Sequence, residues 1–217
     1  MGIRAPGSSF ERDSLEQAGL DFPGLAWCEL GNQRMRGKPA KQIYLERGVA
    51  EHVCIDLNGR DGALVLDLEQ PVPTELRQRF DVVTNYGTSE HVNNQYQVFR
   101  NMHLLCREGG LMIHNVPRTG NWPDHCRYYY GDDFPAALAQ MCGYDFVLQR
   151  LLDFDHYKAP RNLLAWTFKK TAAGFPSESA FRGVAGIVDS GDLRKTGDYN
   201  ARRLKYRLRA KVAQWLG

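Results

Sequence analysis

The residues best suited to chemistry in this chain stand just beyond predicted strands. Residues 80–85 read as a short buried strand, and Glu90 and His91 follow it closely. A second acid–imidazole pair, Asp124 and His125, follows a later strand. Imidazole titrates near neutral pH and suits proton transfer, so His91 is the preferred base and His125 the second choice. Ligands of open α/β sheets bind outside the carboxyl ends of the strands, so both pairs are expected to border a site.

Three earlier strands also end in acids, namely Glu29, Asp56 and Asp67. An acid at the end of the second strand is the usual partner of ribose hydroxyls in a nucleotide-binding fold. A single strand-end acid is often only a helix N-cap, but three in register favour a ligand site. Gly31 follows the first of these acids, and the offset to Asp56 suits a nucleotide-binding unit.

The elements that position these residues alternate between strands and helices. Strands are predicted over 25–31, 51–57, 63–68, 80–85, 111–116, 146–152 and 163–169, and helices over 39–47, 93–106 and 132–142. Alternation predicts a mostly parallel sheet with helices on both faces. The last two strands have no helix between them, which predicts an antiparallel pair at one edge. The expected fold class is therefore α/β, Rossmann-like, with a seven-stranded sheet.

The chain divides into four parts by composition. Residues 1–23 form a lead-in helix, for which Ser8 and Glu11 fit a capping box. Residues 24–170 form the α/β body, and residues 171–198 read as a linker rich in Gly, Ser and Asp. Residues 199–217 predict a basic amphipathic helix. The segment 194–217 holds eight Lys/Arg and one acid, or +7 (8 − 1), within a chain of net charge +3.

Taken in order, these motifs resemble the class I S-adenosylmethionine-dependent methyltransferases over residues 24–170. The resemblance rests on Glu29-Leu30-Gly31, on Asp56 and Asp67, on the polar segment 85–91, and on Gly109-Gly110 before the fifth strand. It implies S-adenosyl-L-methionine as cofactor. The residues it assigns to the cofactor are Glu29, Gly31, Asn32, Asp56, Leu57, Asp67, Leu68, Asn85, Tyr86 and Gly87. Those it assigns to the substrate are Glu90, Asn115, Asp124, Tyr128 and Tyr129.

The first loop departs from the family pattern, because only Gly31 of the usual glycines is present. Asn32 tolerates left-handed backbone, so the loop is either altered and working or degenerate. The favoured function is methylation of a small molecule, at a hydroxyl of a sugar or secondary metabolite. The alternatives are a non-catalytic binding or assembly module, and an RNA methyltransferase that uses the basic tail. A metal held by Glu90, His91, Asp124 and His125 is a further alternative, although the favoured reading assigns no metal.

Composition sets the remaining expectations for this chain of 217 residues. Its five cysteines are scattered with no C-x-x-C, which predicts buried thiols such as Cys28 and Cys54 rather than disulfides or zinc. No apolar run approaches the roughly 20 residues of a membrane span, and the first residues lack a signal-peptide core. We expect a cytoplasmic protein without a membrane partner. The apolar face of the C-terminal helix is expected to dock on the body or on a second copy in a homodimer.

Overall fold

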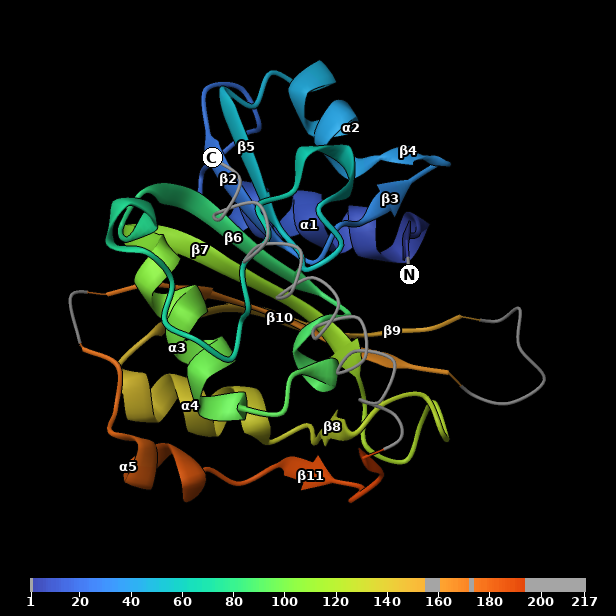
Figure 1. The fold of residues 1–217 in the computed structure, drawn as a ribbon, viewed down its shortest axis with the longest axis vertical. Helices are drawn as coiled ribbons and strands as arrows, with labels where there is room; N and C mark the ends of the chain where they lie inside the picture. Colours follow the sequence, from blue (N-terminus) through green and yellow to red (C-terminus); the bar gives the residue numbers. More distant parts are fainter. Residues whose placement is uncertain (1, 155–160, 172–173, 194–217) are drawn as a thin grey trace, which may run out of the picture.

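The computed structural model describes residues 2–154, 161–171 and 174–193. Its centre is a six-stranded sheet in the spatial order β5, β2, β6, β7, β10, β9 (Figure 1). The bounds of these strands are Glu51–Ile55, Ala26–Leu30, Phe80–Tyr86, Cys106–Pro117, Leu163–Lys169 and Asp145–Leu152. The first four run parallel to one another, whereas β10 runs antiparallel to both β7 and β9. The mostly parallel sheet and the antiparallel pair at one edge are thus confirmed.

The sheet has six strands rather than seven, because residues 63–68 do not form a strand. Only Leu64 reaches β5, through a single parallel bridge to Ile55. A parallel neighbour needs a crossover of about a dozen residues or more, and only residues 56–62 separate the two segments. Those residues are occupied by the 3₁₀ turn η1 (Arg60–Gly62). The prediction of a third strand was therefore wrong.

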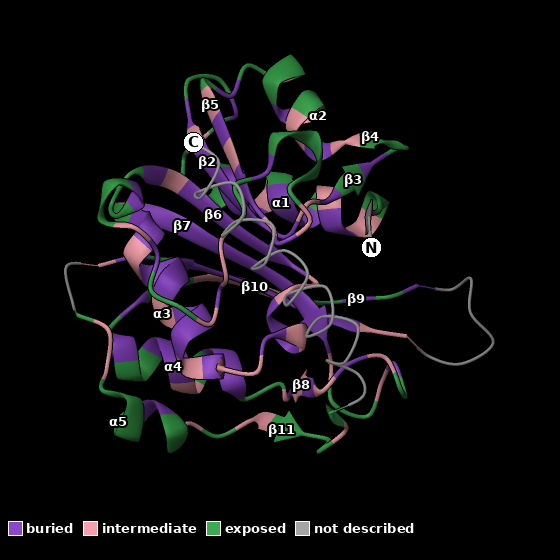
Figure 2. Cartoon of the chain, viewed as in Figure 1, coloured by how far each residue is buried: buried purple, intermediate pink, exposed green. Residues whose placement is uncertain are grey.

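Helices cover both faces of the sheet (Figures 1 and 2). On one face α3 (Gln95–Leu105), α4 (Phe134–Cys142) and α5 (Glu178–Arg182) contribute to one buried apolar cluster. On the other face α1 (Ala5–Gln17) and α2 (Ala40–Glu46) enclose a second. Alternation along each strand feeds both clusters: in β2, Trp27 packs on the α1 face and Cys28 on the α3 face.

Short elements form two further small sheets and two more 3₁₀ turns. The hairpin of β3 (Arg34–Met35) and β4 (Lys38–Pro39) follows β2, and β1 (Gly2–Ile3) pairs with β3. β8 (Tyr128–Tyr130) pairs with β11 (Ile187–Asp189). The 3₁₀ turns η2 (Thr74–Leu76) and η3 (Ser89–His91) flank β6. Both α5 and β11 lie within residues 171–198, the range expected to be a linker.

Three further expectations from the sequence concern the cysteines, a membrane span and the C-terminal helix. All five cysteines are buried and free. In the described part of the chain, no helix is long and apolar enough to cross a lipid bilayer. The basic helix expected over 199–217 lies outside the described residues.

Candidate functional site

A cavity of about 260 Å³ lies where β6 and β7 end. The cavity adjoins the point where the sheet reverses its order of strand addition, between β2 and β6, and open α/β sheets bind ligands at such a point. The cavity is lined by Tyr86 at the end of β6, by Gly87 directly after it and by Asn115 of β7. Gln33 lines it from the first loop. The remaining wall consists of Ile3, Arg4, Trp122, His125, Phe154, Arg161 and Leu163. Three predicted site residues other than histidine, namely Tyr86, Gly87 and Asn115, thus share this wall with His125.

The first loop is held by the two acids that precede and face it. The Asn32 N–H donates to Asp56 Oδ2 at 2.7 Å, and the Gln33 N–H donates a longer bond to Glu29 Oε2 at 3.4 Å. Asp56 Oδ1 accepts a second bond, from the Asn58 N–H at 2.8 Å. Burial raises the pKa of the Glu29 carboxyl to about 8, and its Oε1 has no hydrogen-bond partner among the described residues. Glu29 and Asp56 therefore shape the loop and retain acceptor capacity.

Gly31 lies in close contact with the loop that follows β6. Its φ of +82° is left-handed, and a Cβ placed there would overlap the Thr88 hydroxyl. Thr88 Oγ1 donates to the Leu30 carbonyl at 2.8 Å, so it joins the ends of β2 and β6. Only glycine satisfies both constraints, which is why this single glycine of the family pattern is present.

A buried hydrogen-bond network fixes η3 behind the cavity. Asn85 donates through Nδ2 to Ser89 Oγ at 2.9 Å and accepts from the Ser89 N–H at 3.0 Å. The Tyr130 hydroxyl contacts Ser89 Oγ and Gln95 Oε1, both at 2.8 Å. Asn85, assigned from sequence to the cofactor, thus sets the conformation of the turn that carries Glu90 and His91.

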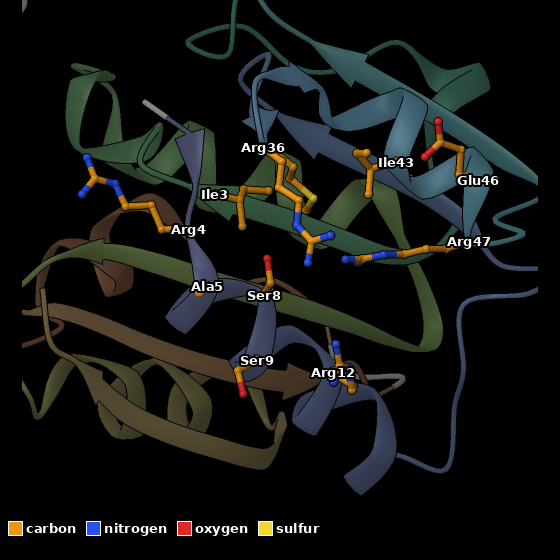
Figure 3. Close-up of a pocket in the computed structure, with 11 residues that line it drawn as sticks. Ile3, Arg4, Ala5, Ser8, Ser9, Arg12, Arg36, Ile43, Glu46 and Arg47 are labelled. Carbon is orange, nitrogen blue, oxygen red and sulfur yellow. The ribbon is translucent and has the colours of Figure 1, made fainter.

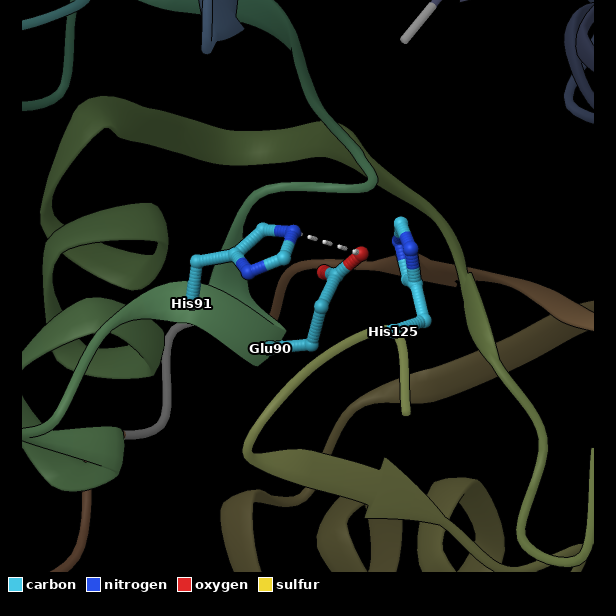
Figure 4. A group of neighbouring side chains, drawn as sticks. All are labelled: Glu90, His91 and His125. Carbon is cyan, nitrogen blue, oxygen red and sulfur yellow. Dashed lines mark ion pairs between the residues drawn. The ribbon is translucent and has the colours of Figure 1, made fainter. Parts of the chain in front are cut away.

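Glu90, His91 and His125 converge (Figure 4). One ligand atom from each lies within 4.8 Å of the others, and the two imidazole centroids are 5.3 Å apart. His91 Nε2 lies 3.9 Å from Glu90 Oε1, and neither Glu90 oxygen has a hydrogen-bond partner among the described residues. Burial raises the pKa of the fully buried Glu90 to about 8. Burial, together with the neighbouring His125, lowers the pKa of His91 to about 4.

Glu11 connects the N-terminal helix to this site, although the sequence assigned it only to a helix cap. The helix begins at Ala5, so the expected capping box at Ser8 is wrong, because Pro6 already fits the first turn. Glu11 is instead fully buried, where its carboxylate accepts from the Tyr44 hydroxyl at 2.5 Å and the Tyr86 hydroxyl at 2.8 Å. Arg47 completes the set at 3.0 Å. A glutamate in a polar helix gives no sequence signal of such a role.

The other residues predicted from sequence lie away from the cavity. The Tyr128 and Tyr129 hydroxyls donate to the main-chain carbonyls of Asn93 and Trp122, each at 3.0 Å. Asp124 is exposed and lies outside the histidine cluster. Leu57 and Leu68 are buried apolar residues, and Asp67 Oδ1 accepts from the Glu69 N–H at 3.1 Å.

A second cavity, of about 660 Å³, adjoins the first, since Ile3 and Arg4 line both. Arg36 and Arg47 extend their guanidinium groups toward each other across it, and the Ser8 hydroxyl points into it (Figure 3). Arg12, from the next turn of α1, also lines it. Arginine-rich walls favour phosphate or carboxylate groups.

Comparisons with known proteins identify the fold. No family model matches the chain, and no curated protein matches it in sequence. Among solved structures, a Burkholderia thailandensis 1,6-didemethyltoxoflavin-N1-methyltransferase with bound S-adenosylhomocysteine has a TM-score of 0.55 at 16% identity, over 76% of this chain and 80% of that one. An S-adenosylmethionine-dependent methyltransferase from Mesorhizobium loti has a TM-score of 0.52 at 15% identity, over 76% and 100%. The [4+2]-cyclase SpnF has a TM-score of 0.56 at 12% identity, over 76% and 80%. The chain therefore has the class I S-adenosylmethionine-dependent methyltransferase fold, as the sequence resemblance predicted.

Proposed function

We propose that this chain is an S-adenosylmethionine-dependent methyltransferase that acts on a small molecule, at a hydroxyl of a sugar or secondary metabolite. The observation that carries the proposal is the cavity between the ends of β6 and β7, with His125 on its wall and Glu90 and His91 behind it. A site at the switch point of the sheet suits a nucleotide-like ligand, and the cavity suits a compact acceptor.

The residues at the ends of β2 and β5 fit the cofactor. Each Asp56 oxygen accepts one N–H and keeps a further acceptor site, which suits the hydroxyls of a ribose. Glu29 holds the loop that would lie against the cofactor, through the N–H of Gln33. When bound, the cofactor supplies an electrophilic methyl group. Asp67 and Leu68 remain a prediction for its adenine side.

The chain's own contribution is to orient and activate the acceptor. Trp122, Phe154 and Leu163 give the cavity an apolar wall, and Asn115 gives it an amide. Alignment of the acceptor within such a wall supplies on the order of 7–11 kcal/mol in methyl transfer. The imidazoles of His91 and His125 would either accept a proton from the hydroxyl or bind a cation that acidifies it.

Calorimetric titration with S-adenosylhomocysteine tests the proposal. We expect binding to the wild-type chain, weakened about tenfold or more in Asp56→Asn, because loss of a charged acceptor costs about 1.5–3 kcal/mol. Asp61→Asn is the matched control. Asp61 accepts a hydrogen bond from the Asn32 side chain at the surface and does not bind the main chain of Asn32. Absence of binding to the wild-type chain, or equal affinity in the two variants, contradicts the proposal.

One observation favours a second candidate, a methyltransferase fold kept as a non-catalytic binding module. The Thr88–Leu30 hydrogen bond bridges the two loops between which the cofactor would lie. If that bridge stays closed, the wild-type chain binds no S-adenosylhomocysteine. If the bridge opens for the ligand, Thr88→Ala tightens binding.

A further inference from the structure

Glu90 presents a chemical problem that its described neighbours do not solve. Its side chain is fully buried, and neither carboxylate oxygen accepts a hydrogen bond from a described residue. A buried carboxyl group without a hydrogen-bond partner is unfavourable whether neutral or charged, and buried charges are normally paired or bound to a metal. His91 Nε2 lies 3.9 Å from Glu90 Oε1, which is too distant for a hydrogen bond.

The groups around Glu90 form a set of ligands that metals use. The imidazoles of His91 and His125 stand on either side of the Glu90 carboxylate (Figure 4). Two imidazoles and one carboxylate suit a divalent first-row cation and leave coordination positions open. Ligands at about 2.0–2.2 Å from a tetrahedral zinc lie roughly 3.4 Å apart, so the present spacing of up to 4.8 Å needs only small side-chain movements.

Neighbouring residues fix the positions of Glu90, His91 and His125, and the cavity lies next to them. Glu90 and His91 sit on η3, which is anchored by Asn85 and Tyr130 through Ser89. The His125 ring lies against Trp122, with centroids 5.6 Å apart. Because His125 also lines the cavity, an ion held here would face the ligand that the cavity binds.

We propose that Glu90, His91 and His125 bind a divalent transition-metal cation such as Zn²⁺ at the edge of the cavity. The cation site stands on the geometry of these three residues alone. Its use in orienting an oxygen of the acceptor rests on the proposed function. The two histidines then act as ligands rather than as free bases, and Asp124, the fourth residue of the sequence-based metal set, is not a ligand.

Titration of the chelator-treated full chain with Zn²⁺ and with Co²⁺ tests the site, by calorimetry and by the visible absorption of bound Co²⁺. We expect one ion per chain in the wild type and affinity at least about tenfold weaker in Glu90→Gln and in His125→Gln. Asp124→Asn is the control, because it removes an exposed acid next to His125 and leaves the cluster intact. Wild-type affinity in Glu90→Gln, or no ion bound by the wild type, overturns the site.

Thermal denaturation separates a lost ligand from a damaged fold. Without metal, Glu90→Gln is expected to melt at or above the wild-type temperature, since it removes an unpaired buried carboxyl. Zn²⁺ at about a hundred times its Kd is expected to raise the wild-type Tm by about 5–10 °C, and that of Glu90→Gln by much less. Equal increases in both overturn the site. Binding of S-adenosylhomocysteine without metal binding refutes this inference alone, and metal binding without S-adenosylhomocysteine refutes the proposed function alone.

Discussion

Gly31→Ala is expected to destabilise the fold much more than Gly24→Ala. Both glycines have φ +82°, but a Cβ at Gly24 has nothing within 4 Å, whereas one at Gly31 overlaps the Thr88 hydroxyl. Left-handed backbone costs alanine about 1–2 kcal/mol, partly offset by about 0.4–1 kcal/mol because the unfolded chain loses entropy. This contribution is common to both variants.

The additional loss at Gly31 comes from Thr88. Displacement of its side chain breaks the 2.8 Å bond to the Leu30 carbonyl, worth about 1 kcal/mol, and overpacking adds about 1–3 kcal/mol. We therefore expect the free energy of unfolding of Gly31→Ala to lie at least about 2 kcal/mol below that of Gly24→Ala. Tm should then be lower by about 4–8 °C.

Urea denaturation of the two variants and of a double variant provides the assay. Thr88→Ala removes the overlapping oxygen, so in the Gly31→Ala background it should cost less than it does alone, with a coupling energy of about 1–2 kcal/mol. Gly31→Ala and Gly24→Ala variants equal within about 0.5 kcal/mol, or strictly additive effects, would refute the close packing of the two loops.

Two further predictions concern buried ionisable groups. Glu11→Gln should lower the free energy of unfolding by about 2–4 kcal/mol, because it leaves Arg47 unpaired and weakens two tyrosine bonds. Tyr86→Phe should cost only about 1 kcal/mol, and equal losses in denaturant melts would contradict the role of the Glu11 charge. Burial lowers the pKa of His52 to about 4, against about 6.5 in the unfolded chain. Between these pH values the unfolded chain binds more protons, so the free energy of unfolding decreases as the pH is lowered. By pH 5 this residue should account for a loss of about 2 kcal/mol, which His52→Phe abolishes; parallel pH–stability curves would be the contrary result.

Local patterning predicted the order of elements well, because each strand of the sheet contains a short apolar run. Residues 163–169 and 146–152 lack an intervening helix, and they pair antiparallel as expected. The strand predicted over 63–68 was wrong, because its composition suits a strand but its connection to β5 is too short for a parallel crossover.

Glu90, His91 and His125 were all named as candidates from the sequence, but their convergence was not predictable. Glu90 and His91 follow β6 directly, so the strand-end rule found them. His125 joins them through a loop in which Trp122 and Asp124 have left-handed backbone, at φ 54° and 60°. Left-handed backbone is not expected at Trp122, so the sequence could not show that His125 turns inward while Asp124 stays exposed.

The docking of α1 also bears on how the chain folds during synthesis. The Ser14 hydroxyl lies 2.7 Å from that of Thr167, across 153 positions of sequence, and Arg150 pairs with Asp13. α1 therefore packs on β9 and β10, which are synthesised long after it. At about 5–20 residues per second, its apolar residues Phe10 and Leu15 wait roughly 10–30 s for their binding surface.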